Sequence, residues 1–429
     1  MKIMFHIEDK NVRSLLFEGY FGLEKENLRT TAQGYMAHSS HPFYNHQHIV
    51  RDFCENQIEI NTPIKTSLSD AVKSLWAYTK EIQNVLNQLS EVEYLWPFSN
   101  PPYIRNEEDI KIAQFEGNDA KKTLYREYLS DRYGRYKMTF SGIHFNFSFS
   151  DELLKADFHL SGQKDFQEYK NELYVQLAEG MAAYGWILVA LTAASPLLDS
   201  SFVEKGVYGR NTFNGMASTR CSELGYWNYF TPIFNYHDIH AYADSIQRYV
   251  DDGLLSAPSE LYYPIRLKSC GENSLERLHS NGVDHIELRM LDLNPFEQSG
   301  IQIKDLQFAQ LLLIWLASTP RHILTLKDQV QAVQNFKNAA HYDLKTVKIV
   351  LPDGDVYSVA DAGRKVIKLM RAFYQDFNQD IHDILDFEEE KFIDPYKRYA
   401  WQIRKLYADG FVEKGLQLAK ERQKEITDV

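Results

Sequence analysis

The chain has 429 residues, of which 44% are hydrophobic and 25% are charged, a composition typical of a globular protein with an ample core and no large disordered part. Its formal net charge of −12 argues against general binding to nucleic acid or to an anionic membrane, because both require clustered lysine and arginine. Aromatic residues are abundant, with 27 tyrosines and 25 phenylalanines, which suits a deep, partly polar pocket.

The cysteines and the apolar segments indicate the compartment. Cys54, Cys221 and Cys270 are widely spaced and form neither a C-x-x-C pair nor a Cys/His cluster, which favours a reducing environment. The N-terminal segment meets acidic residues within its first ten positions, unlike a signal peptide. The most apolar run, residues 181–195, is too short to cross a bilayer and predicts a buried helix. We therefore expect a soluble, cytoplasmic protein.

The hydrophobic pattern predicts alternating strands and helices. In chain order it predicts a strand at 20–29, a strand at 55–63, a helix at 69–89, a strand at 141–150, a long helix at 165–196 broken near Gly185 and ended by Pro196, a loop-like region at 199–225, a strand at 283–293, a helix at 304–319, and three amphipathic helices between 360 and 427. No internal repeat or clear linker interrupts this order. We therefore predict one α+β domain over residues 1–429, of which 340–429 form a mainly helical C-terminal portion.

Each predicted strand carries polar side chains on one face and apolar side chains on the other. In the third strand, Phe145 and Phe147 alternate with His144 and Asn146. This pattern is typical of an antiparallel sheet whose apolar face packs on helices and whose polar face lines a cavity. The polar set consists of Glu24, Glu26, Glu59, His144, Asn146, Glu287 and Arg289, and Asp52 precedes the second strand.

Two interpretations of this polar face are open. A single glutamate on an alternating strand usually faces solvent, and a lone histidine is usually a hydrogen-bonded core residue. Recurrence in four otherwise apolar strands favours a site for hard divalent cations, because Mg²⁺ prefers carboxylate oxygens and substrate phosphates, and the histidine extends tolerance to Mn²⁺. The pattern alone does not decide between them.

Motifs that bind phosphate through glycine-rich loops are absent from the sequence, which contains neither a P-loop nor a dinucleotide fingerprint. A nucleotide would have to be held by metals and basic side chains. The candidates are Arg289 and, within YYPIRLK at 262–268, Arg266 and Lys268, for which an ordinary surface cation is the alternative. No Ser–His–Asp order or activated cysteine indicates covalent catalysis.

Nine stretches, in this order, resemble glutamate–cysteine ligase of the bacterial type. They are GLEKENLR, RDFCENQIEINTP, LWPFSNPPYI, IAQFEG, KTLYREYLSDRYG, SGIHFNFS, SELGY, YYPIRLK and HIELRMLDLNPF, and they cover about residues 18–300. The same region is similar to the N-terminal part of bifunctional glutathione-synthesising enzymes, where an ATP-grasp module for the glycine step follows. Because the sequence stops at Val429, the resemblance implies the first ligation alone.

The resemblance implies both a fold and a reaction. The fold is a glutamine-synthetase-like, curved, mostly antiparallel sheet backed by helices, which forms a funnel. In the reaction, ATP phosphorylates the γ-carboxylate of glutamate, and the amine of L-cysteine then displaces phosphate, as the first step of glutathione biosynthesis. Two or three Mg²⁺ ions, with Mn²⁺ as an alternative, would neutralise the negative charge of the reactants.

The resemblance also assigns residues. The implied metal ligands are Glu24, Glu26, Glu59, His144 and Glu287. Arg289 would meet the transferring phosphoryl group as a fixed planar cation. The implied amino-acid pocket is Phe53, Tyr125, Arg126, Tyr226 and Tyr262, with Asn146 and Arg220 beside it. Asp52 is the candidate that accepts the proton of the attacking ammonium, and Arg266 and Lys268 are the candidates for nucleotide binding.

Three alternatives stay open. The protein could join glutamate to another small amine, it could be a catalytically inactive homologue that senses glutamate or nucleotide, or it could be a metallohydrolase. The expected partners are glutamate, cysteine and ATP, without nucleic acid or membrane, in a monomer or a weak homo-oligomer. Lys25 alternates with Glu24 and Glu26 and is therefore expected on the opposite face, in a structural role.

Overall fold

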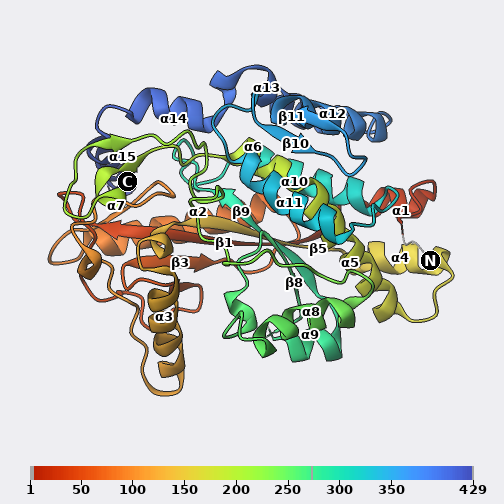
Figure 1. Cartoon of the computed structure of the whole chain (residues 1–429), viewed down its shortest axis with the longest axis horizontal. Helices are drawn as coiled ribbons and strands as arrows, with labels where there is room; N and C mark the ends of the chain where they lie inside the picture. The colour runs from red at the N-terminus through yellow and green to blue at the C-terminus, as the bar shows by residue number, and fades with distance from the viewer. Residues whose placement is uncertain (1–3, 272–273, 428–429) are drawn as a thin grey trace.

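The computed structural model describes residues 4–271 and 274–427. Within these residues, the main sheet has seven strands, all paired antiparallel, in the order β2-β3-β1-β5-β9-β8, with β4 paired to β1 (Figure 1). The strands are β1 (Gly19–Thr30), β2 (Ile49–Arg51), β3 (Gln57–Asn61), β4 (Tyr94–Leu95), β5 (Gly142–Phe149), β8 (Ile265–Lys268) and β9 (His285–Asp292). Two small hairpins pair β6 (Leu198–Asp199) with β7 (Asn211–Thr212), and β10 (Lys348–Val350) with β11 (Val356–Ser358).

The helices account for most of the remaining chain. In order they are α1 (Lys10–Leu15), α2 (Leu68–Asn87), α3 (Ala120–Tyr133), α4 (Asp151–Ser161), α5 (Phe166–Tyr184), α6 (Trp186–Thr192), α7 (Ser200–Val203), α8 (Ile239–Asp251), α9 (Leu275–Asn281), α10 (Ile303–Ala317), α11 (Leu326–Ala339), α12 (Val359–Phe373), α13 (Gln379–Ile393), α14 (Tyr399–Tyr407) and α15 (Phe411–Thr427). Short 3₁₀ turns are η1 (Glu107–Asp109), η2 (Gly117–Asp119), η3 (Lys137–Thr139), η4 (Pro258–Glu260) and η5 (Pro395–Lys397).

The four predicted strands are confirmed as β1, β3, β5 and β9, and the α+β class with an antiparallel sheet backed by helices is confirmed as well. The sheet is open and uncurled, since its two edge strands, β2 and β8, do not pair with each other. β2 and β8, which flank it, were not predicted. Between 360 and 427 the chain forms four helices rather than three, because α14 is a separate short helix between the breaks at 394–398 and 408–410.

The long apolar helix expected at 165–196 is interrupted where predicted. α5 and α6 meet at Gly185 with a bend of 55°, and α6 ends at Thr192, before Pro196. A Cβ at Gly185 would come within 2.5 Å of the carbonyl oxygen of Met181, so a side chain does not fit at the bend. Among the described residues no single helix has the length and apolarity of a membrane span, although the bent pair α5 and α6 together meet those two criteria.

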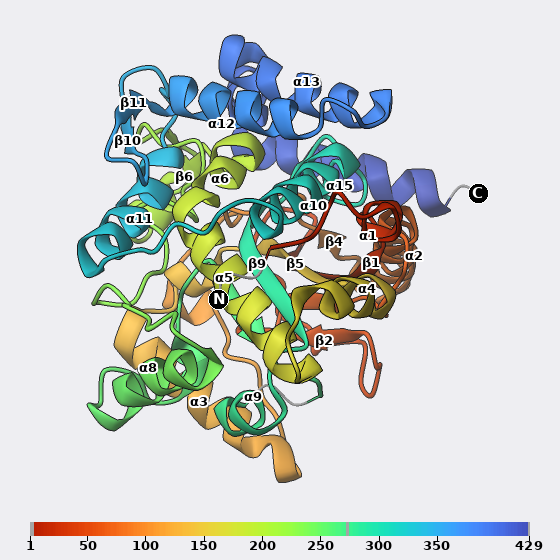
Figure 2. The same ribbon diagram turned by 90° about the vertical axis from the view of Figure 1, so that its right-hand side faces the viewer.

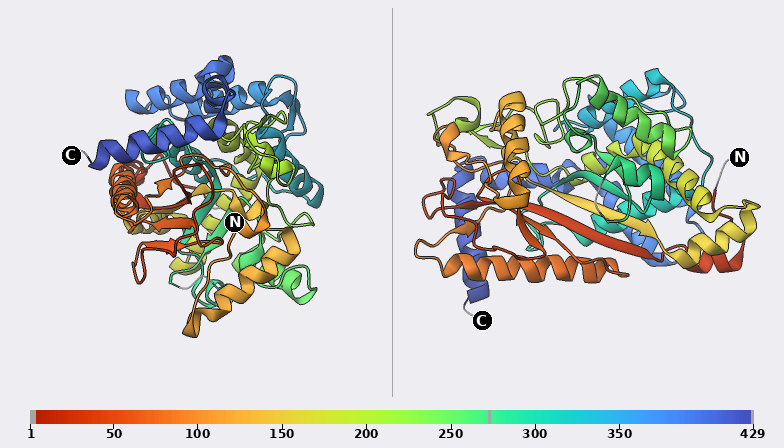
Figure 3. Two further views of the ribbon diagram at one scale, coloured as in Figure 1. Left: turned by 90° about the vertical axis from the view of Figure 1, so that its left-hand side faces the viewer. Right: turned by 90° about the horizontal axis from the view of Figure 1, so that it is seen from below.

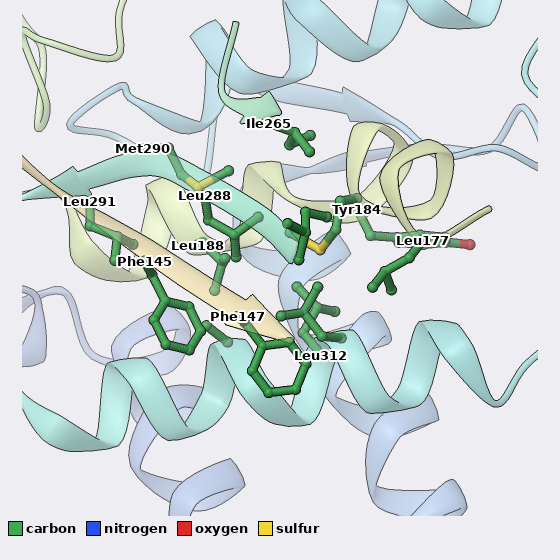
Figure 4. Packing of buried hydrophobic residues seen from close by; sticks show 14 of the residues in the cluster. Phe145, Phe147, Leu177, Tyr184, Leu188, Ile265, Leu288, Met290, Leu291 and Leu312 are labelled. Atoms are coloured by element: carbon green, nitrogen blue, oxygen red, sulfur yellow. The ribbon is translucent and has the colours of Figure 1, made fainter. Parts of the chain in front are cut away.

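The apolar face of the sheet packs on helices α2, α5 and α6, and α10 packs against all three; in Figure 2, α2 and α5 lie on opposite sides of the labelled strands β5 and β9. Phe145 and Phe147 of β5 and Leu288 of β9 are fully buried there against Leu188 and Leu312 (Figure 4). Helix α15 crosses α2 beside the sheet (Figure 3). Helices α3, α8 and α9 extend from the other side, so the polar face lies between them (Figure 1).

The ladder between β5 and β9 contains an irregularity beside the polar face. Phe145 pairs with Leu288 and Ile143 pairs with Leu291, so β9 uses one residue more than β5 over this stretch. In a regular strand, residues three apart point to opposite faces, yet Leu288 and Leu291 are both partnered by buried apolar residues of β5. The irregularity is a β-bulge, which re-aims the side chains of β9 on either side of it.

Candidate active site

Polar side chains of three strands converge on the polar face. Glu24 of β1, His144 of β5 and Glu287 of β9 each offer a ligand atom, and these atoms all lie within 4.8 Å of one another. Nδ1 of His144 is 2.8 Å from Oε2 of Glu24 and 3.5 Å from Oε1 of Glu287. The sheet register produces this arrangement, since Glu24 is the direct partner of His144, and Asn146 is that of Glu287.

Two further carboxylates extend this group along β1 and β3. Glu26 and Glu59 are direct partners in the register, and Oε1 of Glu26 is 3.7 Å from Nε2 of His144. Oε2 of Glu26 accepts a hydrogen bond of 2.9 Å from the backbone N–H of Gly142. The five predicted metal ligands therefore share one face of the sheet, and we call Glu24, Glu26, Glu59, His144 and Glu287 the acidic cluster.

Basic side chains border the acidic cluster on β8 and β9. Arg289 donates from Nη1 to Oε1 of Glu287 at 2.9 Å, and Nζ of Lys268 lies 3.3 Å from Oε2 of Glu287. Arg266 differs, because its Nη2 donates to two backbone carbonyl oxygens in the turn before β8. Arg289 and Lys268 thus face the cluster, whereas Arg266 fixes that turn.

The crowded carboxylates have widely separated pKa values. Burial and then the charge of Asp52 raise the pKa of Glu26 to about 8, and the same two causes raise the pKa of Glu59 well above its usual value. Burial also opposes ionisation of Glu287, but Arg289 and the neighbouring cations hold the pKa of Glu287 well below its usual value. Without a cation, burial therefore favours the protonated forms of Glu26 and Glu59, and a bound cation would favour their ionised forms.

The donors of the acidic cluster fit a hard divalent cation. Burial and then Arg289 lower the pKa of His144, so its imidazole is neutral, and its buried Nε2 makes no hydrogen bond to any described residue. Burial and the charge of Glu287 raise the pKa of Glu24, but the hydrogen bond from His144 and the charge of Lys268 outweigh them and keep the pKa of Glu24 below its usual value. Carboxylate oxygens with one neutral imidazole are ligands that Mg²⁺ and Mn²⁺ accept.

A cavity of about 150 Å³ opens beside the acidic cluster, and Glu26 and Arg289 form part of its wall. We call it the first cavity. Six predicted residues line it: Asp52, Phe53, Tyr125, Arg126, Tyr226 and Tyr262. Leu129, Met138, Phe140 and Ser259 also line it and were not predicted, since apolar and small polar residues in helices and loops carry no distinguishing pattern. The structure thus brings together most of the predicted amino-acid pocket.

The polar side chains that line the first cavity differ in whether they have a hydrogen-bond partner. Arg126 of α3 donates from Nε to the carbonyl oxygen of Asp52 at 2.6 Å and lies 4.8 Å from the ring centroid of Phe115, which fixes the β2–β3 connection to the helix. The buried hydroxyl of Tyr262 has no hydrogen-bond partner among the described residues. Such a hydroxyl in a cavity wall is available to a ligand.

Two predicted pocket residues lie outside the first cavity. Arg220 donates from Nη2 to the carbonyl oxygen of Arg289 at 2.8 Å and lies over Gly142, where a Cβ would come within 2.3 Å of its Cζ. It lines a smaller cavity of about 50 Å³. Asn146 donates from Nδ2 to Oε1 of Glu24 at 2.9 Å. Arg220 thus anchors β9, and Asn146 orients a carboxylate of the acidic cluster.

A second cavity, of about 230 Å³, opens toward the start of β1 and shares Glu24 with the acidic cluster. Asn61, Asn146 and Ser148, on the polar faces of β3 and β5, line it. Its other polar lining residues, Tyr20, Thr62, Asp284 and His285, were not assigned to a site, because only the pairing of β5 with β1 and with β9, and of β1 with β3, brings them together.

The fold and the site define a class: an α+β protein whose open antiparallel sheet presents a cation-competent acidic cluster between two cavities. A family model described as glutamate-cysteine ligase matches residues 4–252 and 229–339. The glutamate–cysteine ligase of Clostridium acetobutylicum is 34% identical over 351 residues, which cover 70% of this chain and 72% of that protein. This chain belongs to the glutamate–cysteine ligase family.

Longer relatives are similar over almost the whole chain. The glutathione biosynthesis bifunctional protein GshAB of Listeria monocytogenes is 34% identical over 436 residues, covering 97% of this chain and 56% of that protein, so the chain spans about half the length of such relatives. The crystal structure of a bifunctional glutathione synthetase from Pasteurella multocida matches with a TM-score of 0.84 at 28% identity, over 99% of this chain and 55% of that one. A glutamate–cysteine ligase from Francisella tularensis, solved in complex with AMP, shares the fold, with a TM-score of 0.87 at 23% identity over 96% of this chain and 89% of that one.

Proposed function

We propose that this protein is an ATP-dependent, ADP-forming ligase that joins the γ-carboxylate of glutamate to the amine of L-cysteine, through a γ-glutamyl phosphate, as the first step of glutathione biosynthesis. The observation that carries the proposal is the acidic cluster between two cavities, with Glu24 in the wall of one and Glu26 in the wall of the other. Membership of the glutamate–cysteine ligase family supports it.

The acidic cluster would hold the divalent cations of this reaction. We propose two or three Mg²⁺ ions, with Mn²⁺ as an alternative, bound by Glu24, Glu26, Glu59, His144 and Glu287. When bound, they supply charge neutralisation for the phosphates and for the carboxylate that is phosphorylated. The raised pKa values of Glu26 and Glu59 support this role, since a bound cation would offset the cost of ionising these buried carboxyls.

The first cavity would hold the amino-acid substrates. Arg289 lies between the acidic cluster and this cavity, where a fixed planar cation stabilises the charge of the transferring phosphoryl group. The hydroxyl of Tyr262 and the neighbouring Tyr226 would bind the acceptor, with Arg126 at the same wall. Asp52 would accept the proton of the acceptor's ammonium, because an amine must be neutral to attack.

The second cavity would hold the nucleotide, because ATP and the amino acids must approach the same cations without overlapping. Lys268 faces the acidic cluster and is suited to meet a phosphate. Arg266 remains a candidate for nucleotide binding, acting through its charge, since Nη2 of its guanidinium already donates to backbone carbonyl oxygens. The polar lining residues Asn61, Ser148 and His285 would contact the sugar or the base.

The same proposal extends to the domain organisation, the compartment and the oligomeric state. We propose that residues 1–429 act as one domain, supported by the packing of α13 on α10 and of α15 on α2. We also propose a cytoplasmic enzyme, monomeric or weakly homo-oligomeric, that binds neither nucleic acid nor membrane. The three unpaired cysteines support a reducing compartment.

A coupled ADP-release assay tests the function. With ATP and Mg²⁺ present, we expect ADP release to reach its full rate only when both glutamate and cysteine are added. Absence of ADP release with all substrates would contradict the ligase proposal and favour an inactive homologue. Strong preference for an amine without a thiol would overturn the cysteine assignment while keeping the ligase.

The role of Asp52 has its own test. Asp52→Asn should slow the cysteine-dependent step about 10²–10⁴-fold, the usual contribution of a general base, while glutamate-dependent ATP turnover remains. The matched control is Asp131→Asn, an exposed aspartate on α3, which should leave both rates unchanged. An unaltered overall rate in Asp52→Asn removes the proposed role.

A further inference from the structure

Helices α8 and α9 lie side by side on the side of the sheet from which α3 also extends (Figures 1 and 2). His240 of α8 and His279 of α9 face each other there, with their Nδ1 atoms 3.0 Å apart and their ring centroids 4.2 Å apart. Asp244, one helical turn after His240, places Oδ1 3.6 Å from Nε2 of His279. Two imidazoles and one carboxylate thus meet on the surface, away from the acidic cluster.

We propose that His240 and His279 form a surface site for a transition-metal ion, Cu²⁺ or Ni²⁺, which links α8 to α9. Imidazole nitrogen is a ligand that both ions favour. The site shares no residue with the acidic cluster, the first cavity or the second cavity. It therefore does not depend on the proposed ligase function.

The distance between the two nitrogens fits one coordination geometry better than another. Bonds from a metal to a histidine nitrogen are about 2.0–2.1 Å long, so nitrogens 3.0 Å apart subtend roughly 90–95° at an ion that binds both. A tetrahedral ion such as Zn²⁺ requires a separation of roughly 3.3–3.4 Å at the same bond length. A right angle is the cis angle of tetragonal and square-planar coordination, which favours Cu²⁺ and Ni²⁺ over Zn²⁺.

Asp244 completes the arrangement as a positioning residue. A metal-bound histidine usually donates its other ring N–H to a carboxylate, which fixes the tautomer and the ring orientation. Oδ1 of Asp244 faces Nε2 of His279 and leaves Nδ1 directed at His240. Both rings are exposed, so water can fill the remaining coordination positions.

An ion at this site would act on the strands that carry the acidic cluster. Helix α9 connects β8 to β9, and α8 precedes the turn that leads into β8. The two histidines are 39 residues apart, so the ion would close a loop of that length and reduce the entropy of the unfolded chain. Binding is therefore expected to raise the melting temperature and to hold β8 and β9, with Lys268 and Glu287, in their observed register.

The test is a Cu²⁺ titration of the tag-free protein with Mg²⁺ in excess, followed by calorimetry and electron paramagnetic resonance. The background is Cys270→Ser, because the exposed thiol of Cys270 before α9 would itself bind or reduce Cu²⁺. We expect one Cu²⁺ per chain with a spectrum showing two nitrogen ligands. Loss of an orienting partner usually weakens metal binding roughly 10–100-fold, and Asp244→Asn should weaken Cu²⁺ binding by about tenfold. His240→Gln or His279→Gln removes a ligand and should weaken Cu²⁺ binding by more than roughly 100-fold.

The control is His237→Gln, which removes an exposed histidine whose Nε2 is 3.9 Å from Oδ2 of Asp238. It should leave the affinity, the spectrum and the rise in melting temperature unchanged. Equal Cu²⁺ affinity in His240→Gln and in the unaltered background would overturn the proposal, and the two rings would then share only an N–H···N hydrogen bond. Because Cu²⁺ binds nitrogen ligands more tightly than Zn²⁺ in most geometries, the Cu²⁺ spectrum tests the geometry, and a spectrum of tetrahedral rather than tetragonal type would overturn it.

Discussion

Two groups of buried carboxylates lie on opposite sides of the main sheet's apolar core, and they differ in how their charge is balanced. Between α10, α13 and α14, Nζ of Lys391 is 2.6 Å from Oδ1 of Asp305 and 2.8 Å from Oε2 of Glu388. The hydroxyl of Tyr399 donates to the same Asp305 at 3.0 Å. In the acidic cluster, by contrast, four carboxylates share one face of the sheet with a neutral imidazole, and Arg289 and Lys268 stand at the border.

The difference separates a structural group from a binding group. Burial opposes the charge of Lys391, yet Asp305 and Glu388 outweigh this and keep the pKa of Lys391 above its usual value, so the chain carries its own counter-ion. Burial raises the pKa of Glu26 and Glu59, as it does that of Glu388 beside Lys391, so the two groups differ in the internal counter-ion and in the two cavities onto which the acidic cluster opens. A buried charge group that lacks an internal counter-ion and adjoins a cavity is suited to an external cation.

Removing the internal counter-ion should produce the largest effect. Lys391→Met leaves two buried carboxylates without a cation, and loss of one partner of a buried pair costs about 3–5 kcal/mol. Urea unfolding should show this loss, whereas Lys405→Met, at an exposed position of α14, should change the free energy of unfolding by less than about 0.5 kcal/mol. A change in Lys391→Met no larger than that of its control would contradict the comparison.

Removing a carboxylate of the acidic cluster should affect activity instead. Glu26→Gln should lower the ligation rate about 10²–10³-fold and weaken its dependence on Mg²⁺, while the cation-free protein is no less stable, because the raised pKa shows that the charge is unfavourable there. Steady-state rates over a Mg²⁺ titration and urea unfolding without Mg²⁺ measure both effects.

The matched variant on the same strand is Lys25→Gln. Nζ of Lys25 donates to Thr79 and to the carbonyl oxygen of Ser299, each at 3.0 Å, on the helix side of the sheet. Per folded molecule, its rate should fall much less than that of Glu26→Gln, by under about tenfold. Equal losses in the two variants would mean that the polar and apolar faces of β1 do not differ in function.

His41 is a buried ionisable group in which burial outweighs the charge of the nearby Glu55, so we expect it to remain neutral. The ring nitrogens of His41 are buried and make no hydrogen bond to a described residue, and burial and then Arg29 lower the pKa of His41 to about 4. Below pH 6.5 the unfolded chain binds this proton and the folded protein does not. The contribution of neutral His41 to the free energy of unfolding is therefore fully present above pH 6.5. It falls by about 3 kcal/mol as the pH drops to 4.

Unfolding in urea between pH 7 and pH 4.5 tests this effect. His41→Leu should flatten the acid slope of the unfolding free energy, and His159→Leu, at an exposed position of α4, should keep it. A slope that persists in His41→Leu would assign the acid sensitivity to other groups.

Features with a local cause could be predicted from the sequence. Alternation with period two identified β1, β3, β5 and β9 and assigned Glu24 and Glu26 to one face and Lys25 to the other, because strand geometry depends on neighbouring residues alone. The resemblance to the family then supplied pocket residues such as Tyr125 and Tyr262, which alternation does not reveal. Most of these line the first cavity.

Features with a long-range cause could not be predicted. β2 and β8 are too short to show a period, and they are strands because β3 and β9 pair with them. The second cavity depends on register between strands more than 100 residues apart. The contact of His240 with His279 depends on two helices packing together. Arg220 shows the same limit, since its carbonyl partner on β9 is known only once the chain has folded.

The bulge in β9 has a consequence for the length of the chain. Because β9 uses one residue more than β5, Asp292 is paired with Gly142 and accepts hydrogen bonds from Ser195 and Ser218, five residues after Glu287. Deleting one residue between Leu288 and Leu291 would make the ladder regular and would leave Leu291 opposite Ile143 and Asp292 opposite Gly142, each on its present face. The extra residue therefore serves the aim of the side chains on the bulged stretch, Arg289 among them, and its deletion should affect the site more than the pairing of the strands.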